Sequence, residues 1–385
     1  MAARGLGGVV NIDDLRTLAQ RRLPRVVFDY VDGGAEAEIT MRANVQAFEG
    51  VRFRPRSAVA NAPCNLRTTL LGRSFELPFL LAPLGSSRML YPRGECAAAR
   101  AAGKAGTGYI LSTLSGCPLE DVKASTLGRA WYQLYLVGGR SVATAAIARA
   151  RAAGFEALVV TIDTPVAGMR ERDVRNGAKQ LSSGKPLAIL PYAGQLLARP
   201  RWVFDFLRDG GMMRFPNVVL DNGPMAYEDA GSALGESSVS WNDFEWIKAE
   251  WNGPVVVKGV QSREDAERAV ERGADAIVVS NHGGRQLDGV PATLHILPDV
   301  IDAAGDRVEV LIDGGIRRGS DVVKALCLGA RGVLIGRAYA YGLAAAGEAG
   351  VTKAIDILRA DIVRTLNLLG CHDIAALDRS FLVTP

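Results

Sequence analysis

Short apolar runs alternate with amphipathic stretches along most of the chain, from about residue 78 onward. Eight of the apolar runs are continuous and rich in β-branched residues, and they span residues 78–83, 109–113, 130–136, 157–163, 254–259, 276–281, 308–313 and 332–336. Such runs are typical of strands in a parallel sheet that is buried on both faces. The stretches between them, such as 263–272 and 320–328, have helical periodicity.

Eight strands that alternate with helices predict an α/β fold of the (β/α)8 class, the TIM barrel. We expect one domain over residues 1–385, with a leading segment at 1–77, the barrel at 78–350, a long insertion after the fourth strand at 171–240 and a C-terminal helical segment at 351–385. We expect short helices and a strand in the leading segment. The alternative that this pattern leaves open is a doubly wound open sheet.

Composition narrows the class of protein. With 48% hydrophobic and 22% charged residues among 385, the chain can bury a large core, which excludes disorder as its main state. The 45 basic and 41 acidic residues give a net charge of +4, too balanced for a dedicated nucleic-acid binder. Five scattered cysteines without a CxxC pair argue against a disulfide framework and a zinc site. We therefore expect no metal and a reducing, cytoplasmic location, without a signal peptide or a membrane-spanning segment.

Polar residues stand where the predicted strands end. In this class of barrel, the carboxyl ends of the strands line the active site. The residues at these ends are Ser112, Gln133, Tyr135, Thr161, Asp163, Lys258, Ser280, His282, Asp313, Gly336 and Arg337. Each of them taken singly has an ordinary alternative as a cap or loop residue, but a plain core would exclude such a set. The set therefore predicts an enzyme active site at this rim.

Glycine and arginine follow the last two predicted strands, as Asp313-Gly314-Gly315-Ile316-Arg317-Arg318-Gly319 and Gly336-Arg337. Barrels often bind phosphate with these two loops, because glycine lets backbone N–H groups approach the oxygens and arginine adds bidentate donors. The alternative is a pair of ordinary glycine turns. The chain has neither a GxGxxG motif after a first strand nor a Walker motif, so a Rossmann or P-loop nucleotide site is not expected.

The chain has three histidines, and only His282 lies at the end of a predicted strand. His295 falls in a helical stretch, where we expect a packed side chain, and His372 lies near the C-terminus, where we expect a structural or exposed one. His282 is therefore the candidate general base. Asp163 is placed to orient its imidazole, and Arg285, three residues further on, is a candidate ligand for a substrate carboxylate.

At Ser280–Asp288, SNHGGRQLD, the sequence resembles the FMN-dependent 2-hydroxy acid oxidases and dehydrogenases, and within them it is closest in pattern to L-lactate dehydrogenase and (S)-mandelate dehydrogenase. The resemblance covers nearly the whole chain. Its other motifs are FDYVDGGAE (28–36), LAPLG (81–85), YQLY (132–135), TIDTP (161–165), RERD (170–173), VVKG (256–259), DGGIRRGSDVVKAL (313–326) and GRAYAYGLAAAGEAGV (336–351). This many motifs in order make the resemblance specific, whereas a single GG or GR would not.

The resemblance implies FMN as the cofactor and oxidation of an L-2-hydroxy acid to the 2-oxo acid as the reaction. His282 is the implied base, with Asp163 behind it, and Tyr135 would hydrogen-bond the substrate hydroxyl. The implied ligands of the substrate carboxylate are Tyr30, Arg170 and Arg285. The implied FMN contacts are Ser112, Gln133, Thr161, Lys258, Ser280, Asp313, Gly314, Gly315, Arg317, Gly336 and Arg337. Whether hydrogen leaves carbon as a proton or as a hydride stays open.

The substrate pocket is expected to be roomier than glycolate needs. Gly85 stands where short-chain oxidases of the family tend to carry Ala, and Leu114 and Ala167 stand where glycolate oxidase has bulkier groups. A larger pocket suits lactate and also aromatic or branched 2-hydroxy acids. The alternative is that other side chains refill the space.

Residues 177–220 combine basic and bulky apolar side chains. The basic residues are Lys179, Lys185, Arg199, Arg201, Arg208 and Arg214, the acids are Asp205 and Asp209, and the apolar residues are Trp202, Phe204, Phe206, Leu207, Met212, Met213 and Phe215. This mixture predicts a helix that lies on an anionic membrane surface, and the membrane-associated members of the family have a similar insertion. The alternatives are an active-site lid or an oligomer contact.

These observations lead us to expect electron transfer to a quinone or another non-oxygen acceptor, by a protein that contacts the inner face of the cytoplasmic membrane. The family also implies a homo-oligomer, a tetramer. The nearer alternative is an oxidase that produces hydrogen peroxide, and a remote one is an FMN-dependent isomerase without net redox chemistry.

Overall fold

Eight parallel strands close into a barrel in the computed structural model, which describes residues 5–182, 185–235 and 237–383. In chain order the strands are β4 (Phe79–Leu81), β5 (Tyr109–Ser112), β6 (Ala130–Leu134), β7 (Leu158–Thr161), β10 (Val255–Val260), β11 (Ala276–Val279), β12 (Glu309–Asp313) and β13 (Gly332–Ile335). Each pairs with its neighbour in the chain, and β13 pairs with β4 to close the ring. The predicted TIM barrel and all eight predicted strands are confirmed, with ends shorter by up to two residues in most cases.

The strands are almost entirely apolar because they are buried from both sides. Successive side chains point to opposite faces, so Leu80, Ile110, Trp131 and Val159 belong to the cluster inside the barrel. Their neighbours, such as Phe79 and Leu111, pack outward under the helices. The hairpin of β2 (Thr68–Leu70) and β3 (Arg73–Phe75) contributes Leu70 and Phe75 to the inner cluster. It therefore covers the amino-terminal end of the barrel.

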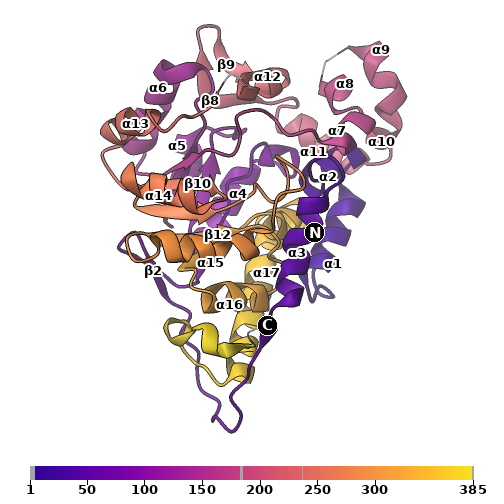
Figure 1. Cartoon of the computed structure of the whole chain (residues 1–385). Helices are drawn as coiled ribbons and strands as arrows, with labels where there is room; N and C mark the ends of the chain where they lie inside the picture. The colour runs from indigo at the N-terminus through magenta and orange to yellow at the C-terminus, as the bar shows by residue number, and fades with distance from the viewer. Residues whose placement is uncertain (1–4, 183–184, 236, 384–385) are drawn as a thin grey trace.

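The helices form the outer ring (Figure 1). Those that follow the strands are α4 (Gly94–Lys104), α5 (Leu119–Ala124), α6 (Gly139–Ala152), α13 (Asp243–Trp251), α14 (Arg263–Glu271), α15 (Thr293–Ala304), α16 (Gly319–Cys327) and α17 (Arg337–Leu369). The expected barrel boundary at residue 350 falls inside α17, which bends at Ala346 and Gly347 but continues to Leu369. His295 lies on α15 and is exposed, so the expected packed side chain is wrong.

The leading segment forms α1 (Ile12–Arg22), α2 (Arg25–Asp32), α3 (Ile39–Gly50) and β1 (Arg52–Phe53) before the hairpin. β1 pairs with β14 (Leu382–Val383) near the other end of the chain, after the short helices η5 (Ile374–Ala376) and η6 (Arg379–Phe381). α1 packs along α17, and α2 lies at the carboxyl-terminal rim of the barrel (Figure 1). The leading segment thus reaches the same rim as the strand ends.

The long insertion between β7 and α13 lies over the carboxyl-terminal rim of the barrel (Figure 1). It contains α7 (Glu171–Arg175), α8 (Ala178–Ser182), α9 (Pro186–Ile189), η3 (Leu190–Tyr192), α10 (Ala193–Leu197) and α11 (Pro200–Arg208), then a hairpin of β8 (Arg214–Leu220) and β9 (Gly223–Ala226), then η4 (Tyr227–Asp229) and α12 (Ala230–Gly235). The helix expected within 177–220 is not continuous, since the segment contains several short helices, among them α11, and ends in a strand. Trp202, Met213 and Phe215 are buried, and only part of its apolar set faces outward.

Three contacts dock α11 onto α1 and onto the segment that follows β4. Asp205 accepts from Arg22 at 2.8 Å, and the Trp202 Nε1–H donates to the Met89 carbonyl at 2.9 Å. At the end of the helix, Asp209 accepts from Arg88 at 2.7 Å in a half-buried ion pair. Both acids of the segment therefore serve to hold α11 in place.

Candidate functional site

A cavity of about 750 Å³ opens at the carboxyl ends of the strands, beneath the insertion between β7 and α13. It brings together residues that lie far apart in the sequence, from α2, from the loops after most barrel strands and from the insertion. The predicted site residues that line it are Tyr30, Gly85, Ser112, Leu114, Tyr135, Thr161, Ala167, Arg170, Lys258, His282, Arg285, Asp313, Gly314, Gly315, Arg317, Gly336 and Arg337. Three others, Gln133, Asp163 and Ser280, are buried and bond to lining residues. The structure therefore gathers the whole predicted set.

His282 and Asp163 form a hydrogen-bonded pair. The Nδ1 atom of His282 lies 2.9 Å from the Asp163 Oδ1 atom, which is buried. His282 has a left-handed backbone with φ of 57°, and its N–H donates to the Ser280 hydroxyl at 3.1 Å. A non-glycine residue held in that conformation is uncommon and is often found at functional sites. The carboxylate engages Nδ1, so Nε2 is the ring nitrogen left for chemistry.

Asp163 is held as a carboxylate despite its burial. Desolvation alone would raise its pKa, but His282, Lys258 and the Thr164 hydroxyl together lower the pKa below its ordinary value. A carboxylate beside an imidazole favours the protonated ring once a proton arrives. The pair is therefore suited to taking up a proton at Nε2 and stabilising the resulting cation.

Lys258 is a buried cation at the end of β10. Its ammonium lies 3.0 Å from the Asp313 Oδ2 atom and donates to the Ser280 hydroxyl at 2.9 Å. Burial works against its charge, yet Asp313 and Asp163 raise its pKa above the ordinary value. The site thus keeps one fixed positive charge among strand ends, where it would attract an electron-rich group.

A second positive centre is built from Arg285 and Arg170 beside Tyr30. The two guanidinium carbons lie 5.2 and 6.0 Å from the centre of the Tyr30 ring, respectively. Burial, with Arg170 and Arg337 nearby, lowers the pKa of Arg285 to about 9, so it remains charged at neutral pH. The carboxylate of Asp173 lies 3.9 Å from Arg170. Two neighbouring arginines, of which Arg170 has this one ion pair, supply the donors that a substrate carboxylate needs.

Hydroxyl donors and a small hollow lie between these two centres. Burial and the charge of Asp163 raise the pKa of Tyr135 well above its ordinary value, which keeps its phenol neutral and able to donate. The Tyr30 hydroxyl donates to the Gly85 carbonyl at 3.1 Å. A methyl group added at Gly85 would lie 3.3 Å from the Leu114 Cβ atom, so the absent side chain leaves room in the hollow.

The far end of the cavity is lined by glycine and arginine. Gly315 approaches the Asn44 carbonyl so closely that a Cβ atom would lie 2.1 Å from it, which requires glycine there. Arg337 is buried, and its guanidinium donates to the carbonyls of Val31, Gly33 and Gly283 at 3.1, 2.7 and 2.8 Å. The side chain of Arg337 is therefore bonded to the end of α2, to Gly33 after it and to the turn that follows His282. What it offers an anion is its backbone N–H at the start of α17, with Arg317 beside it.

Several buried polar atoms at the strand ends have no hydrogen-bond partner among the described residues. They include the Gln133 Nε2, Thr161 Oγ1 and Asp313 Oδ1 atoms. An unmet buried polar group costs about 1–3 kcal/mol, so a set of them at one place indicates that a ligand supplies the partners.

Two residues of the site were not singled out from the sequence. Asp173 lies inside the RERD motif without a predicted role of its own, and the sequence predicts no role for Tyr227 of η4. Burial and the neighbouring Tyr30 and Asp173 raise the pKa of Tyr227, while Arg170 and Arg285 work in the opposite direction. Tyr227 thus faces the arginine pair from the insertion. Nothing in the local pattern around Tyr227 distinguishes it from a loop tyrosine.

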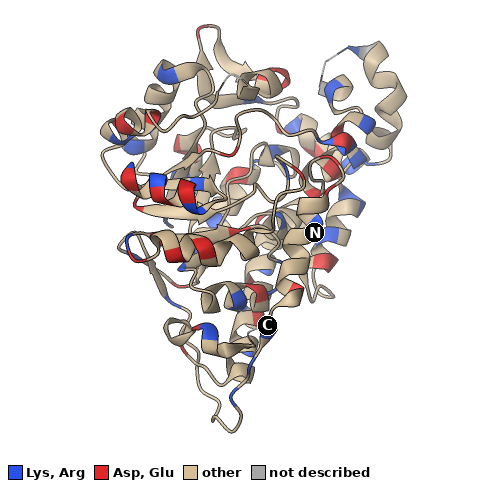
Figure 2. Cartoon of the chain, in the orientation of Figure 1, with Lys and Arg blue, Asp and Glu red and all other residues tan. Residues whose placement is uncertain are grey.

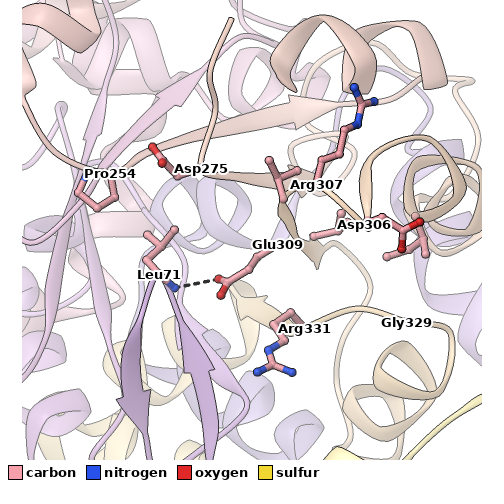
Figure 3. A pocket seen from close by; sticks show the side chains of 12 residues that line it. Leu71, Pro254, Asp275, Asp306, Arg307, Glu309, Gly329 and Arg331 are labelled. Carbon is pink, nitrogen blue, oxygen red and sulfur yellow. Dashed lines mark hydrogen bonds between the residues drawn. The ribbon is translucent and has the colours of Figure 1, made fainter. Parts of the chain in front are cut away.

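A second cavity, of about 650 Å³, lies at the opposite end of the barrel (Figure 3). Its charged residues include Asp275, Glu309 and Arg331, and Figure 3 shows Glu309 bonded to the backbone of Leu71. That bond measures 2.9 Å. Across the described residues, no group of three or more His, Cys, Asp or Glu side chains is arranged to hold a metal ion.

The chain is similar to known proteins over almost its full length. A sequence model of the family described as FMN-dependent dehydrogenase matches residues 19–384. An L-lactate dehydrogenase of Caulobacter vibrioides is 44% identical over 382 residues, 97% of each chain. A peroxisomal (S)-2-hydroxy-acid oxidase of Oryza sativa subsp. japonica is 40% identical over 97% of this chain and 96% of that protein. The crystal structure of the monotopic membrane protein (S)-mandelate dehydrogenase superimposes with a TM-score of 0.91 at 39% identity and covers 98% of this chain and 100% of that one.

Proposed function

The chain belongs to the family of FMN-dependent dehydrogenases, and from this premise we propose how its residues divide the work and where the electrons go. It oxidises an L-2-hydroxy acid to the 2-oxo acid with FMN as its cofactor. The roles of single residues, the substrate side chain, the acceptor and the membrane contact are our proposals.

The cavity fits FMN in both of its halves. The partnerless Gln133 amide and Thr161 hydroxyl lie at the strand ends, where the carbonyl and N–H edge of a flavin ring would meet them. Gly314, Gly315, Arg317 and the start of α17 form the anion-binding end that a ribityl phosphate needs. Bound FMN would accept the two electrons of the oxidation, and Lys258 would favour negative charge on the ring.

Proton removal falls to His282 in this proposal. Its Nε2 atom takes the proton, and Asp163 holds the ring and stabilises the imidazolium. Tyr135, kept neutral by its raised pKa, donates to the substrate hydroxyl oxygen. The paired His282 and Asp163 carry this assignment, and they serve equally for a proton taken from carbon or from the hydroxyl.

The substrate carboxylate is held by Arg285, Arg170 and Tyr30. Both guanidinium groups lie within 6.0 Å of the centre of the Tyr30 ring, so a carboxylate bound near that ring would meet donors from both arginines. The substrate side chain then faces Gly85, Leu114 and Ala167. We propose lactate or a bulkier, mandelate-like acid as the substrate, because none of these three residues fills the hollow.

We propose that the enzyme contacts a membrane through a membrane face, which we define as Leu187, Leu190, Leu197, Phe204 and Leu207 of α9–α11. All five are at least 64% exposed. Figure 2 shows α9 without charged residues, whereas α14 alternates the two signs. On α11, Arg201 and Arg208 are exposed beside Phe204, so cationic ends can reach lipid headgroups around the apolar stems. None of the helices in the described ranges is long and apolar enough to cross a bilayer.

The membrane face supports a membrane quinone as the acceptor of the electrons. A matched pair of variants tests the contact. Leu187→Gln, Leu190→Gln, Leu197→Gln and Phe204→Gln are combined in one protein, and Leu127→Gln with Leu368→Gln serves as the control, since both leucines are at least 72% exposed outside this face. We expect the first protein to bind phosphatidylglycerol-containing vesicles about tenfold or more weakly, and the control to bind normally. Co-sedimentation measures it, and equal binding by all three proteins contradicts the proposal.

A further inference from the structure

The cavity extends past the residues that we assign to FMN and to the hydroxy acid. Beyond Tyr30 and Gly85 it continues beneath α11, where Val203, Phe206 and Leu207 line it on one side. Val27 of α2 and Met89 of η2 (Ser87–Met89) line it on the other side. All five of these side chains are apolar. We call this part of the cavity the apolar passage.

The walls of the passage are fixed. The Trp202 bond to the Met89 carbonyl and the ion pairs Arg22–Asp205 and Arg88–Asp209 hold α11 at both ends and in the middle. The Trp202 and Phe206 rings stack at 4.8 Å. Protein interiors are packed with few voids, so apolar space kept open by a helix tied this firmly calls for an occupant.

The passage opens at the membrane face. Leu207 lines the cavity and is 65% exposed, and Met212, which also lines it, is 46% exposed. One end therefore meets the surface that we propose lies on lipid, and the other meets His282 and the strand ends. A small hydroxy acid such as lactate has no side chain long enough to use these walls, since its carboxylate would be bound at Arg285 and Arg170.

We propose that a membrane quinone reaches the active site through the apolar passage, with its ring toward the strand ends and its chain past Val203 and Leu207. This inference rests on the proposed membrane function. The hydroxy acid loses its C–H and O–H bonds, and with them two electrons and two protons. Bound FMN would supply the electron relay between the two substrates, and the quinone would take up two electrons and two protons on its two oxygens to become the quinol. Acid oxidation and quinone reduction then occur in turn in one cavity.

Two variants narrow the passage, and one serves as a control. Val203→Trp fills it beneath α11. Leu207→Trp narrows the exposed mouth, where folding tolerates a larger side chain. Val174→Trp is the matched control, because Val174 lies on α7, is 60% exposed and does not line the cavity.

The holoenzymes are compared in turnover with decylubiquinone and with ferricyanide, and in anaerobic flavin bleaching by L-lactate and by L-2-hydroxyoctanoate. We expect both passage variants to lower kcat/KM for decylubiquinone at least about tenfold, while ferricyanide turnover and bleaching by L-lactate stay within about twofold. A photoreactive azidoquinone should label residues 200–213 in the wild type and in Val174→Trp, and not in Val203→Trp.

Unchanged quinone turnover in both passage variants overturns the proposal. So does selective loss of bleaching by L-2-hydroxyoctanoate, which would assign the passage to the side chain of a long substrate. A wild type that is bleached by L-lactate and bound to vesicles but reduces no quinone would refute the proposed acceptor and the passage, and would leave the hydroxy acid oxidation standing.

Discussion

The two ends of the barrel carry similar side chains, yet they differ in whether those side chains already have partners. At the amino-terminal cavity of Figure 3, Glu309 accepts from the Leu71 N–H, Asp275 from the Val255 N–H, and Arg331 donates to the Thr69 carbonyl. At the carboxyl end, buried atoms of Gln133 and Thr161 have no partner among the described residues. Polar residues in a hollow are therefore not enough to identify a site, and partnerless polar atoms gathered around one cavity add to the evidence.

The two ends also differ in burial. Lys258 is 3% exposed and Asp313 is 7% exposed, so neither side chain has bulk water to replace its ion-pair partner. Arg331 at the opposite end is exposed and loses little if its bond breaks. Substitutions of the same kind should therefore have large effects at one end and small effects at the other.

The largest effect is expected for His282→Gln. Loss of the base should slow flavin reduction by substrate about 10²- to 10⁴-fold, because Gln cannot take up the proton. Stopped-flow bleaching under anaerobic conditions measures it, and the flavin content of the purified variant checks that the site still forms. A rate within about tenfold of the wild type would remove His282 from the reaction.

Lys258→Met should destabilise the fold strongly, because it leaves Asp313 buried without its ion-pair partner. Breaking a buried pair in this way costs about 3–5 kcal/mol in the free energy of unfolding. Urea unfolding followed by circular dichroism measures it, with Arg331→Met as the matched control, expected within about 0.5 kcal/mol of the wild type. The double variant Lys258→Met with Asp313→Asn should recover part of the loss. Equal stability of the two single variants would contradict the contrast between the ends.

The smallest effect is expected for Glu309→Gln. Burial raises the pKa of Glu309 in the folded protein, so the stability that this residue contributes is present below the unfolded pKa of about 4.3 and is lost as pH rises through the higher folded value. The variant should remove this part of the pH dependence, change stability at pH 7 by less than about 1 kcal/mol and leave turnover unchanged. Thermal unfolding between pH 4 and 7 measures the change in stability. A loss of activity would show that the amino-terminal cavity takes part in function.

Much of the fold could be predicted because the eight strands are short, continuous apolar runs, a pattern that burial on both faces imposes. Much of the site followed from the same pattern, since residues such as Lys258 and Asp313 stand where strands end. The resemblance of whole motifs to those of the family implied FMN as the cofactor and a hydroxy acid as the substrate, neither of which residue spacing could indicate. Tyr227 was missed because it comes from the insertion, whose path over the rim no local pattern records.

The residues of 177–220 show a different limit. An alternation of basic and bulky apolar side chains is the same whether the apolar face meets lipid or the protein's own core. The sequence could not distinguish Trp202, which is buried, from Phe204, which is 64% exposed. Only the docking of α11 through Asp205 and Asp209 decides which face turns outward.

By itself the sequence determined the strands, the rim where chemistry gathers and the family, because these depend on local burial and on motifs that remain contiguous along the chain. The tertiary structure decided which side chains meet. Arg337 is taken up by carbonyls of α2 and the turn after His282, Tyr30 reaches arginines more than a hundred residues away, and α11 leaves an apolar passage open beside them. These are long-range contacts, and their geometry depends on how the packed elements close around one cavity.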